Sequence, residues 1–228
     1  GSAIRPFFDP TIALVRELGG GGAASVFGEK IGFPARYAAF LNSIIITTST
    51  YQETHRASVV HPYSPVLSTA LAVGEELSRT GRDLMAAVVA GYEVLVRICT
   101  AVNPSFLGRG IQPTGAIGPI GAAAACAKLM GLPREQLRHA LNHAANFSGG
   151  ALMEAKGARP YFSIQVGVNV EKGILAAHLA QKGVVGCDTI LEGGSVSAKG
   201  FLQAYADSYD LKVIREGLGP RLGIQDTG

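Results

Sequence analysis

The stretch GRGIQPTGAIGPIGAAAACAKLMG, residues 108–131, decides the fold. A loop of glycine and proline runs here into a segment built almost wholly of small side chains. The glycines and the proline within 115–121 each weaken a helix, by about 1 kcal/mol per glycine and by more for the proline. A helix with this composition is favoured only where close approach to neighbouring backbones offsets that cost. We therefore predict a helix over 114–130 at the centre of a bundle, with its first turn facing a pocket or a neighbouring element.

The flanking sequence has the periodicity of amphipathic helices, with Gly and Pro at their ends. A β-branched stretch over 43–65 ends in two prolines and predicts mixed helix and loop. The chain has no internal repeat, heptad run or alternating strand and helix pattern, so the expected fold class is all-α. The further helices are expected at 10–19, 34–43, 66–77, 83–102, 133–147 and 167–182, followed by a weaker amphipathic piece at 199–217.

Composition limits the classes of function. The chain has 228 residues, of which 47% are hydrophobic and only 16% charged. We expect one large domain that buries part of its surface against a second copy or a partner. The net charge of +3 is scattered, without basic runs or interleaved aromatic residues, so nucleic-acid binding is not expected.

Localisation is expected to be cytoplasmic. The most apolar segment, 84–96, is interrupted by Glu93 and closed by Arg97, so it is shorter than the roughly 18 to 20 apolar residues of a membrane span. A signal peptide is not expected, because the printed sequence does not open with a charged segment followed by an apolar one. The cysteines at 99, 126 and 187 are odd in number and widely spaced, which is typical of reduced thiols and not of a disulfide framework or a CxxC metal site.

Several motifs contain residues that can act in catalysis or ligand binding. Each motif also has a simpler structural explanation. His55 and His61 lie in a polar loop, and histidine titrates near neutral pH. The pair at 139 and 143 has the spacing of metal ligands but lacks the Glu and a third ligand, so no metal is expected. The segment 154–162 predicts a loop whose cations could hold a carboxylate or be solvated. Glu93 and Arg97 are expected to form an ordinary intrahelical ion pair.

Four segments occur in an order that resembles the MmgE/PrpD family. They are AAFLNS, THRASVVHPYSPVLSTALAVGEELSRTGRDLMAAVVAGYEVLVRI, GRGIQPTGAIGPIGAAAACAKLMGLPREQLRHALNHAANFSGG and GVNVEKGILAAHLAQKGVVGCDTILEG. The resemblance covers 11–193. The family includes 2-methylcitrate dehydratase, cis-aconitate decarboxylase and iminodisuccinate epimerase.

The resemblance implies a dimer with a large helical domain and a smaller α+β lid, and an active site between the two domains. On that basis we expect a helical domain over 1–193 and, over 194–228, a rudimentary lid, a swapped arm or a tail. The full lid is expected to be absent. The chain is then a fragment, a half whose partner chain carries the lid, or a pared-down relative.

The family's polar motifs are altered at most of the matching positions. The DFDDT motif corresponds to TYQET at 50–54, which keeps only Thr54, and the HP pair is kept at His61. The family's RGFHPT appears as RGIQPT, which puts Gln112 in place of the catalytic histidine. The family's lysine falls on Phe162. Because Gln cannot shuttle a proton and Phe carries no charge, the resemblance implies a more apolar pocket and an altered reaction.

We therefore expect His61 and Tyr51 to be catalytic, and a small-molecule substrate to contact Thr54, Gln112, Phe162, Arg109 and Lys156. Neither a metal nor a cofactor is called for. The first hypothesis is an isomerase, cyclase or elimination enzyme of a specialised pathway that acts on a less acidic substrate. The second keeps the family's lyase chemistry on a citrate-like or aconitate-like acid, with Glu53, His55 or Lys156 replacing the missing groups. The third is a non-catalytic helical subunit or binding module.

Overall fold

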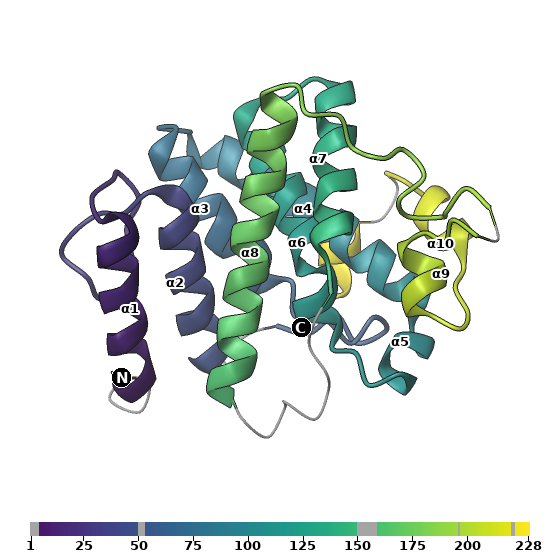
Figure 1. Cartoon of the computed structure of the whole chain (residues 1–228), viewed down its shortest axis with the longest axis horizontal. Helices are drawn as coiled ribbons and strands as arrows, with labels where there is room; N and C mark the ends of the chain where they lie inside the picture. Colours follow the sequence, from purple (N-terminus) through teal and green to yellow (C-terminus); the bar gives the residue numbers. More distant parts are fainter. Residues whose placement is uncertain (1–4, 50–52, 150–158, 196, 220–221) are drawn as a thin grey trace.

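The computed structural model describes residues 5–49, 53–149, 159–195, 197–219 and 222–228. The chain folds as a bundle in which α1, α2, α8 and α7 lie side by side, with α4 and α6 behind them (Figure 1). Within the described residues there is no strand, only isolated β-bridges. The predicted all-α fold class is confirmed.

The helices begin and end close to most of the predicted positions. Their bounds are α1 Arg5–Gly19, α2 Ala35–Ser49, the π-helical turn η2 Tyr63–Leu67, α3 Ser68–Glu76, α4 Gly81–Val102, α5 Ser105–Gly108, α6 Pro113–Met130, α7 Arg134–Phe147, α8 Arg159–Gln181, α9 Phe201–Tyr205, α10 Leu211–Arg215 and the 3-10 turn η4 Gly223–Asp226.

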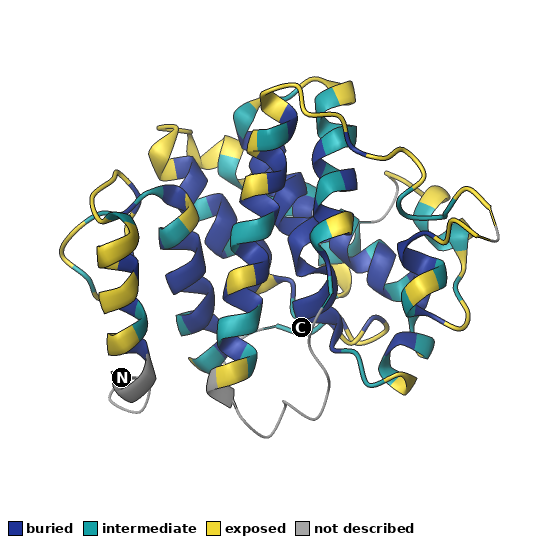
Figure 2. Cartoon of the chain, in the orientation of Figure 1, coloured by how far each residue is buried: buried dark blue, intermediate teal, exposed yellow. Residues whose placement is uncertain are grey.

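The helix α6 is the centre of the bundle, as its composition predicts. Every residue from 113 to 129 is buried except Lys128, and α6 packs against α3, α4, α7 and α8. Figure 2 shows the buried residues concentrated in the interior of the bundle, with the exposed ones on its rim. A helix buried all round needs small residues on several faces at once, which explains the run of alanines and glycines.

Three glycines set the distance between the central helices. A Cβ atom added to Gly91 of α4 would lie 2.9 Å from the carbonyl oxygen of Gly121, and one added to Gly121 would lie 3.2 Å from that of Gly91. A Cβ added to Gly173 of α8 would lie only 2.5 Å from the carbonyl oxygen of Pro119. The backbones of α4 and α8 therefore approach α6 at distances that other residues would not allow.

Three predicted boundaries were wrong. The helix α8 begins at Arg159 and not near 167, so the predicted loop over 154–162 is wrong from Arg159 onward; a proline is well tolerated in a first helical turn, as at Pro160. Pro10 lies inside α1 and not near its start. The helix α2 continues through the β-branched stretch to Ser49, because tertiary packing buries Ile44 and Ile46 and overrides their weaker helix propensity.

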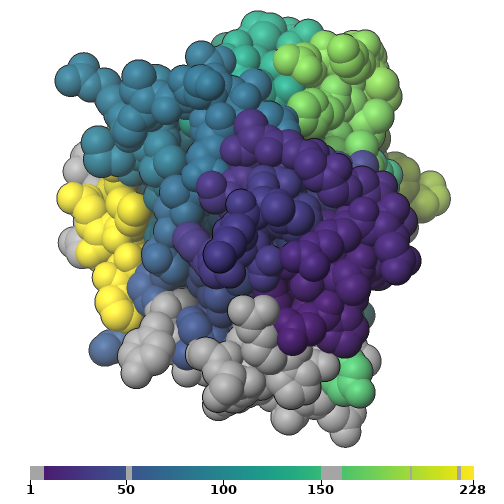
Figure 3. Space-filling model, turned by 90° about the vertical axis from the view of Figure 1, so that its left-hand side faces the viewer, coloured from purple at the N-terminus to yellow at the C-terminus, as the bar shows by residue number. Residues whose placement is uncertain are grey.

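The C-terminal residues are held against α4 by one ion pair. The Arg97 Nε atom donates to Glu93 Oε1 at 2.5 Å, which confirms the predicted intrahelical pair. The rest of the Arg97 guanidinium donates to three carbonyl oxygens within 213–217 at 2.7 to 3.0 Å, and Glu93 Oε2 accepts from the Gly223 amide at 2.7 Å. Figure 3 shows the C-terminal residues packed beside the segment that contains α4.

By length and apolar composition α4 could cross a membrane, but half of its most apolar stretch is buried inside the fold. It packs against α6 as a core helix does. Cys99 and Cys126 are buried, free thiols, whereas Cys187 is free and exposed. Burial raises the pKa of the Cys126 thiol to about 12 and that of Cys99 well above its usual value, so neither is a thiolate at neutral pH.

Substitution of Gly173 tests the close contact between α6 and α8. We expect Gly173→Ala to lower the free energy of unfolding by about 1 to 3 kcal/mol, because its methyl group overlaps the Pro119 carbonyl and the Ala122 side chain. Gly81→Ala is the matched control, since a Cβ added there meets no atom within 4 Å. Urea unfolding measures both. Equal stability of the two variants would contradict the contact.

Candidate functional site

Polar groups gather at the start of α6, and Gln112 is the residue that caps this helix. Its side-chain Oε1 accepts from the Gly115 amide at 2.8 Å, and its Nε2 donates to Thr114 Oγ1 at 3.3 Å. The side chain is buried. Both ends of the amide are thus used to satisfy the first turn of α6, a task usually done by Ser, Thr, Asp or Asn.

The His61 ring is oriented by its backbone neighbours. Its Nδ1 lies 2.9 Å from the Glu53 carbonyl oxygen and 3.1 Å from Thr54 Oγ1, and its own amide donates to Thr114 Oγ1 at 3.0 Å. A carbonyl oxygen only accepts, so Nδ1 carries the hydrogen and the neutral ring keeps its lone pair on Nε2. Nε2 has no hydrogen-bond partner in the part of the chain that the structure describes.

The Glu53 carboxyl group lies behind this histidine. Its Oε1 accepts from the Tyr92 hydroxyl at 2.8 Å and from the Tyr63 amide at 2.7 Å, while its Oε2 is buried without a partner. Burial raises the pKa of Glu53 above its usual value, and the bonds from Tyr92 and Tyr63 offset this only in part. Burial and the neighbouring Glu53 also raise the pKa of Tyr92, which stays a neutral donor.

On the other side of α6, the network reaches α8. Pro119 has no N–H, so the Gly115 carbonyl loses its partner within the helix. The buried Asn169 donates its Nδ2 to that carbonyl at 2.6 Å. Lys172 in turn donates from Nζ to Asn169 Oδ1 at 3.1 Å. A continuous line of polar contacts therefore crosses the start of α6 from Tyr92 on α4 to Lys172 on α8.

The structure brings together only some of the residues predicted for the site. Thr54 contacts the His61 ring, and His61 and Gln112 both donate to Thr114 Oγ1. Phe162 is half-buried in the first turn of α8, two turns before Asn169 and so on the same side of the helix.

Of the other predicted site residues, Arg109 is described by the structure and is not joined to this network. Arg109 is paired with Asp207 at 2.6 Å on an exposed surface. Tyr51 and Lys156 lie outside the described residues.

Several network residues were not predicted as site residues. The sequence predicts Glu53 only as a substitute for a missing acid, and it does not predict Tyr92, Thr114, Asn169 or Lys172. One local signal existed for Asn169: an amide within an apolar helix, GVNVEKG, combined with a proline inside the central helix that it packs against. The contacts of Tyr92 with Glu53 and of Thr114 with His61 join segments 39 and 53 residues apart and left no local signal, whereas Lys172 bonds to Asn169 on the same helix.

Three of the other histidines have structural partners. His55 Nδ1 lies 2.7 Å from Ser58 Oγ, and burial lowers the pKa of His55. His139 Nδ1 accepts from the Gly186 amide at 3.3 Å, and His143 Nε2 lies 3.0 Å from the carbonyl oxygen of Val184. Both rings therefore bind the backbone that follows α8. Across the described ranges, no group of three or more His, Cys, Asp or Glu could hold a metal ion.

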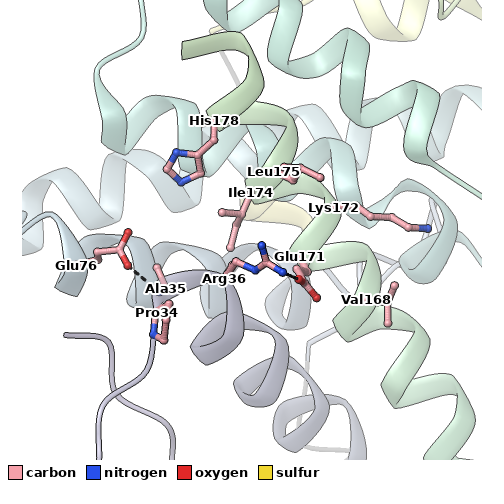
Figure 4. A pocket seen from close by; sticks show the side chains of 10 residues that line it. All are labelled: Pro34, Ala35, Arg36, Glu76, Val168, Glu171, Lys172, Ile174, Leu175 and His178. Atoms are coloured by element: carbon pink, nitrogen blue, oxygen red, sulfur yellow. Dashed lines mark hydrogen bonds and ion pairs between the residues drawn. The ribbon is translucent and has the colours of Figure 1, made fainter. Parts of the chain in front are cut away.

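A cavity of about 390 Å³ lies between the first turn of α2, the end of α3 and the middle of α8, and Lys172 is one of its lining residues. Its wall is largely apolar, with Ile174 and Leu175 on one side, and Arg36 pairs with Glu171 across it at 2.7 Å (Figure 4). Glu76 accepts from the Ala35 amide at 2.8 Å at its edge. This cavity contains none of the predicted site residues.

Known proteins resemble this chain over most of its length. The sequence model of the MmgE/PrpD N-terminal domain matches residues 2–214. Human cis-aconitate decarboxylase is 31% identical over 176 residues, which are 75% of this chain and 36% of that protein. The mouse enzyme is 30% identical over 191 residues, 81% of this chain and 38% of that protein. A cis-aconitate decarboxylase-like protein of Aspergillus oryzae is 29% identical over 179 residues, 75% of this chain and 37% of that protein. The chain spans little more than a third of the length of these relatives.

The capping role of Gln112 can be tested by stability. We expect Gln112→Ala to lower the free energy of unfolding by about 1 kcal/mol, because the Gly115 amide is left buried without an acceptor. Gln112→Asn, which keeps a side-chain carbonyl near the cap position, should recover part of the loss. Chemical unfolding measures both, and an alanine variant as stable as the wild type would rule out the cap.

The buried Glu53 predicts a specific dependence of stability on pH. Its pKa is raised in the folded state above the usual 4.5, so its contribution to stability is fully present below pH 4.5 and is lost as pH rises through the folded value. Relative to the wild type, Glu53→Gln should therefore become more stable as pH rises above 4.5.

For Asp83→Asn we expect the opposite dependence of stability on pH. Hydrogen bonds from Thr80 lower the pKa of Asp83 below its usual 3.8, so the stability it adds is present above that pH and is lost as pH falls. Urea unfolding between pH 3 and 8 measures both variants. A difference between Glu53→Gln and wild type that does not change with pH would contradict the buried carboxyl group.

Proposed function

The chain belongs to the MmgE/PrpD family, and we propose that it is the helical part of a lyase-type enzyme that acts on a carboxylic acid by proton transfer through His61. The single observation that carries this proposal is the orientation of the His61 ring. Its Nδ1 is engaged by the Glu53 carbonyl, so the lone pair needed for a general base is on Nε2, which has no partner among the described residues.

The proposed reaction begins when His61 Nε2 removes a proton from the carbon next to a carboxylate. Elimination follows if a leaving group on the adjacent carbon departs with the bonding electrons, and isomerisation follows if the proton returns at another carbon. The nearby Glu53 attracts the imidazolium that forms. No metal or cofactor is required for these steps.

Gln112 and Phe162 favour a substrate with fewer charges than a tricarboxylate. An amide orients a group by hydrogen bonds but does not exchange protons at ordinary pH. Phe162 adds an apolar wall at the position where the family has lysine. Thr54 and Tyr51 complete the proposed site, Thr54 as a hydrogen-bonding group and Tyr51 as a second proton donor. A cyclase or an isomerase of specialised metabolism is the finer form of this proposal.

Decarboxylation of an aconitate-like acid is the second candidate, and the identity to cis-aconitate decarboxylases favours it. In this version Glu53 replaces one of the missing titratable groups, which its raised pKa suits. We further propose a cytoplasmic homodimer, with a lid domain that a partner chain could supply. A non-catalytic helical subunit is the remaining alternative.

Proton exchange tests the role of His61 without requiring full turnover. The purified chain is incubated in D2O with cis-aconitate, 2-methylcitrate and their analogues with one or two carboxylates, and NMR follows deuterium at the carbon next to each carboxylate. We expect exchange in at least one acid, and a rate about 10²- to 10⁴-fold lower for His61→Gln.

His178→Gln is the matched control, because it removes an exposed histidine of α8 that is outside the network. It should leave the exchange rate unchanged. Exchange that is equally fast in His61→Gln would eliminate His61 as the base. Absence of exchange in every acid, together with absence of CO2 release from cis-aconitate, would favour the non-catalytic alternative.

A further inference from the structure

Lys172 holds an unusual position on α8. Its ammonium group donates to Asn169 Oδ1 at 3.1 Å, and Asn169 is only 1% exposed. Figure 4 shows the Lys172 side chain pointing away from the Arg36–Glu171 ion pair, so it belongs to a different set of contacts from that pair. Its methylene stem lines the edge of the cavity, and its charged end turns toward the buried amide.

The charge of Lys172 has no carboxylate counter-ion within the described part of the chain. The cations Arg36, Arg97 and Arg109, by contrast, each pair with a carboxylate at 2.5 to 2.7 Å. The residue Lys172 is half-buried, and among the described residues its ammonium group is bonded only to a neutral amide, which provides no opposite charge. An anion bound beside the ammonium group would provide the missing opposite charge.

Asn169 fixes the direction of this ammonium group. Its Nδ2 is committed to the carbonyl oxygens of Gly115 and Gly149, at 2.6 and 3.4 Å, so its Oδ1 must face Lys172. Gly115 is also the residue whose amide Gln112 caps. Lys172 and Gln112 are therefore tied to the same residue in the first turn of α6, one through its carbonyl and the other through its amide.

From this arrangement we propose that Lys172 binds a carboxylate group of the substrate beside the start of α6, with Asn169 as the positioning residue that holds its ammonium group. The proposal rests on the proposed function in that it takes a carboxylic acid as the ligand, but it requires binding only and no turnover.

Calorimetric titration of the full chain with cis-aconitate, at low salt, tests the proposal. We expect Lys172→Met to weaken binding by about tenfold or more, because one charge-assisted hydrogen bond is lost. Lys172→Arg should retain much of the affinity. The uncharged trimethyl ester of cis-aconitate should bind equally to the wild type and to Lys172→Met.

The matched control is Lys182→Met, which removes the same charge from the exposed end of the same helix. It should change the affinity less than twofold. Circular dichroism establishes that each variant is folded, and Lys172→Gln carries the test if Lys172→Met does not fold. Equal weakening by Lys172→Met and Lys182→Met, or no measurable binding of cis-aconitate to the wild type, would overturn the proposal.

The two proposals fail in different ways. If cis-aconitate binding depends on Lys172 but no acid exchanges protons, the proposed enzymatic function is contradicted and the proposed carboxylate site is supported. If proton exchange depends on His61 but Lys172→Met binds cis-aconitate as tightly as the wild type, the proposed enzymatic function is supported. The proposal that Lys172 binds the substrate is then contradicted.

Discussion

Close approach of the α4 and α8 backbones to α6 is the constraint on which the rest of the structure depends. Gly91, Gly121 and Gly173 allow separations at which a single added methyl group would overlap a carbonyl group. At these separations the small side chains of α6 exclude water on every face, and dispersion contacts between backbones replace those that large side chains usually make. The weak intrinsic helicity of this segment is the cost of that packing.

The same constraint produces the polar network. Pro119 lies where α6 meets α8, and its missing N–H leaves the Gly115 carbonyl inside the bundle without its usual partner. A buried carbonyl without a hydrogen bond is unfavourable, so Asn169 on α8 supplies one. Asn169 in turn orients Lys172. The packing of the central helix and the placement of a cation are therefore connected through one hydrogen bond.

In the structure Gln112 has a role, the capping of α6, that its sequence context does not reveal. In place of a histidine it suggests lost proton transfer, yet in the fold its amide satisfies the Gly115 amide and Thr114 together. It therefore maintains the end of α6 that carries the rest of the network. His61 is connected to Gln112 through Thr114, and Glu53 beside it is a carboxyl group whose burial raises its pKa.

The sequence by itself determined the all-helical class, the central position of 114–130, the Glu93–Arg97 pair and the family, because periodicity, helix punctuation and small-residue composition are local properties. Through resemblance it also predicts that Thr54, His61 and Gln112 share a site, and in the structure hydrogen bonds connect the three. Only the tertiary structure decided that α8 begins at Arg159, that Arg97 holds the C-terminal residues, and that Tyr92, Asn169 and Lys172 join the network. The contacts of Arg97, Tyr92 and Asn169 join segments distant in the chain, and such contacts leave no periodic signal in the sequence. Lys172 joins the network through Asn169 on the same helix.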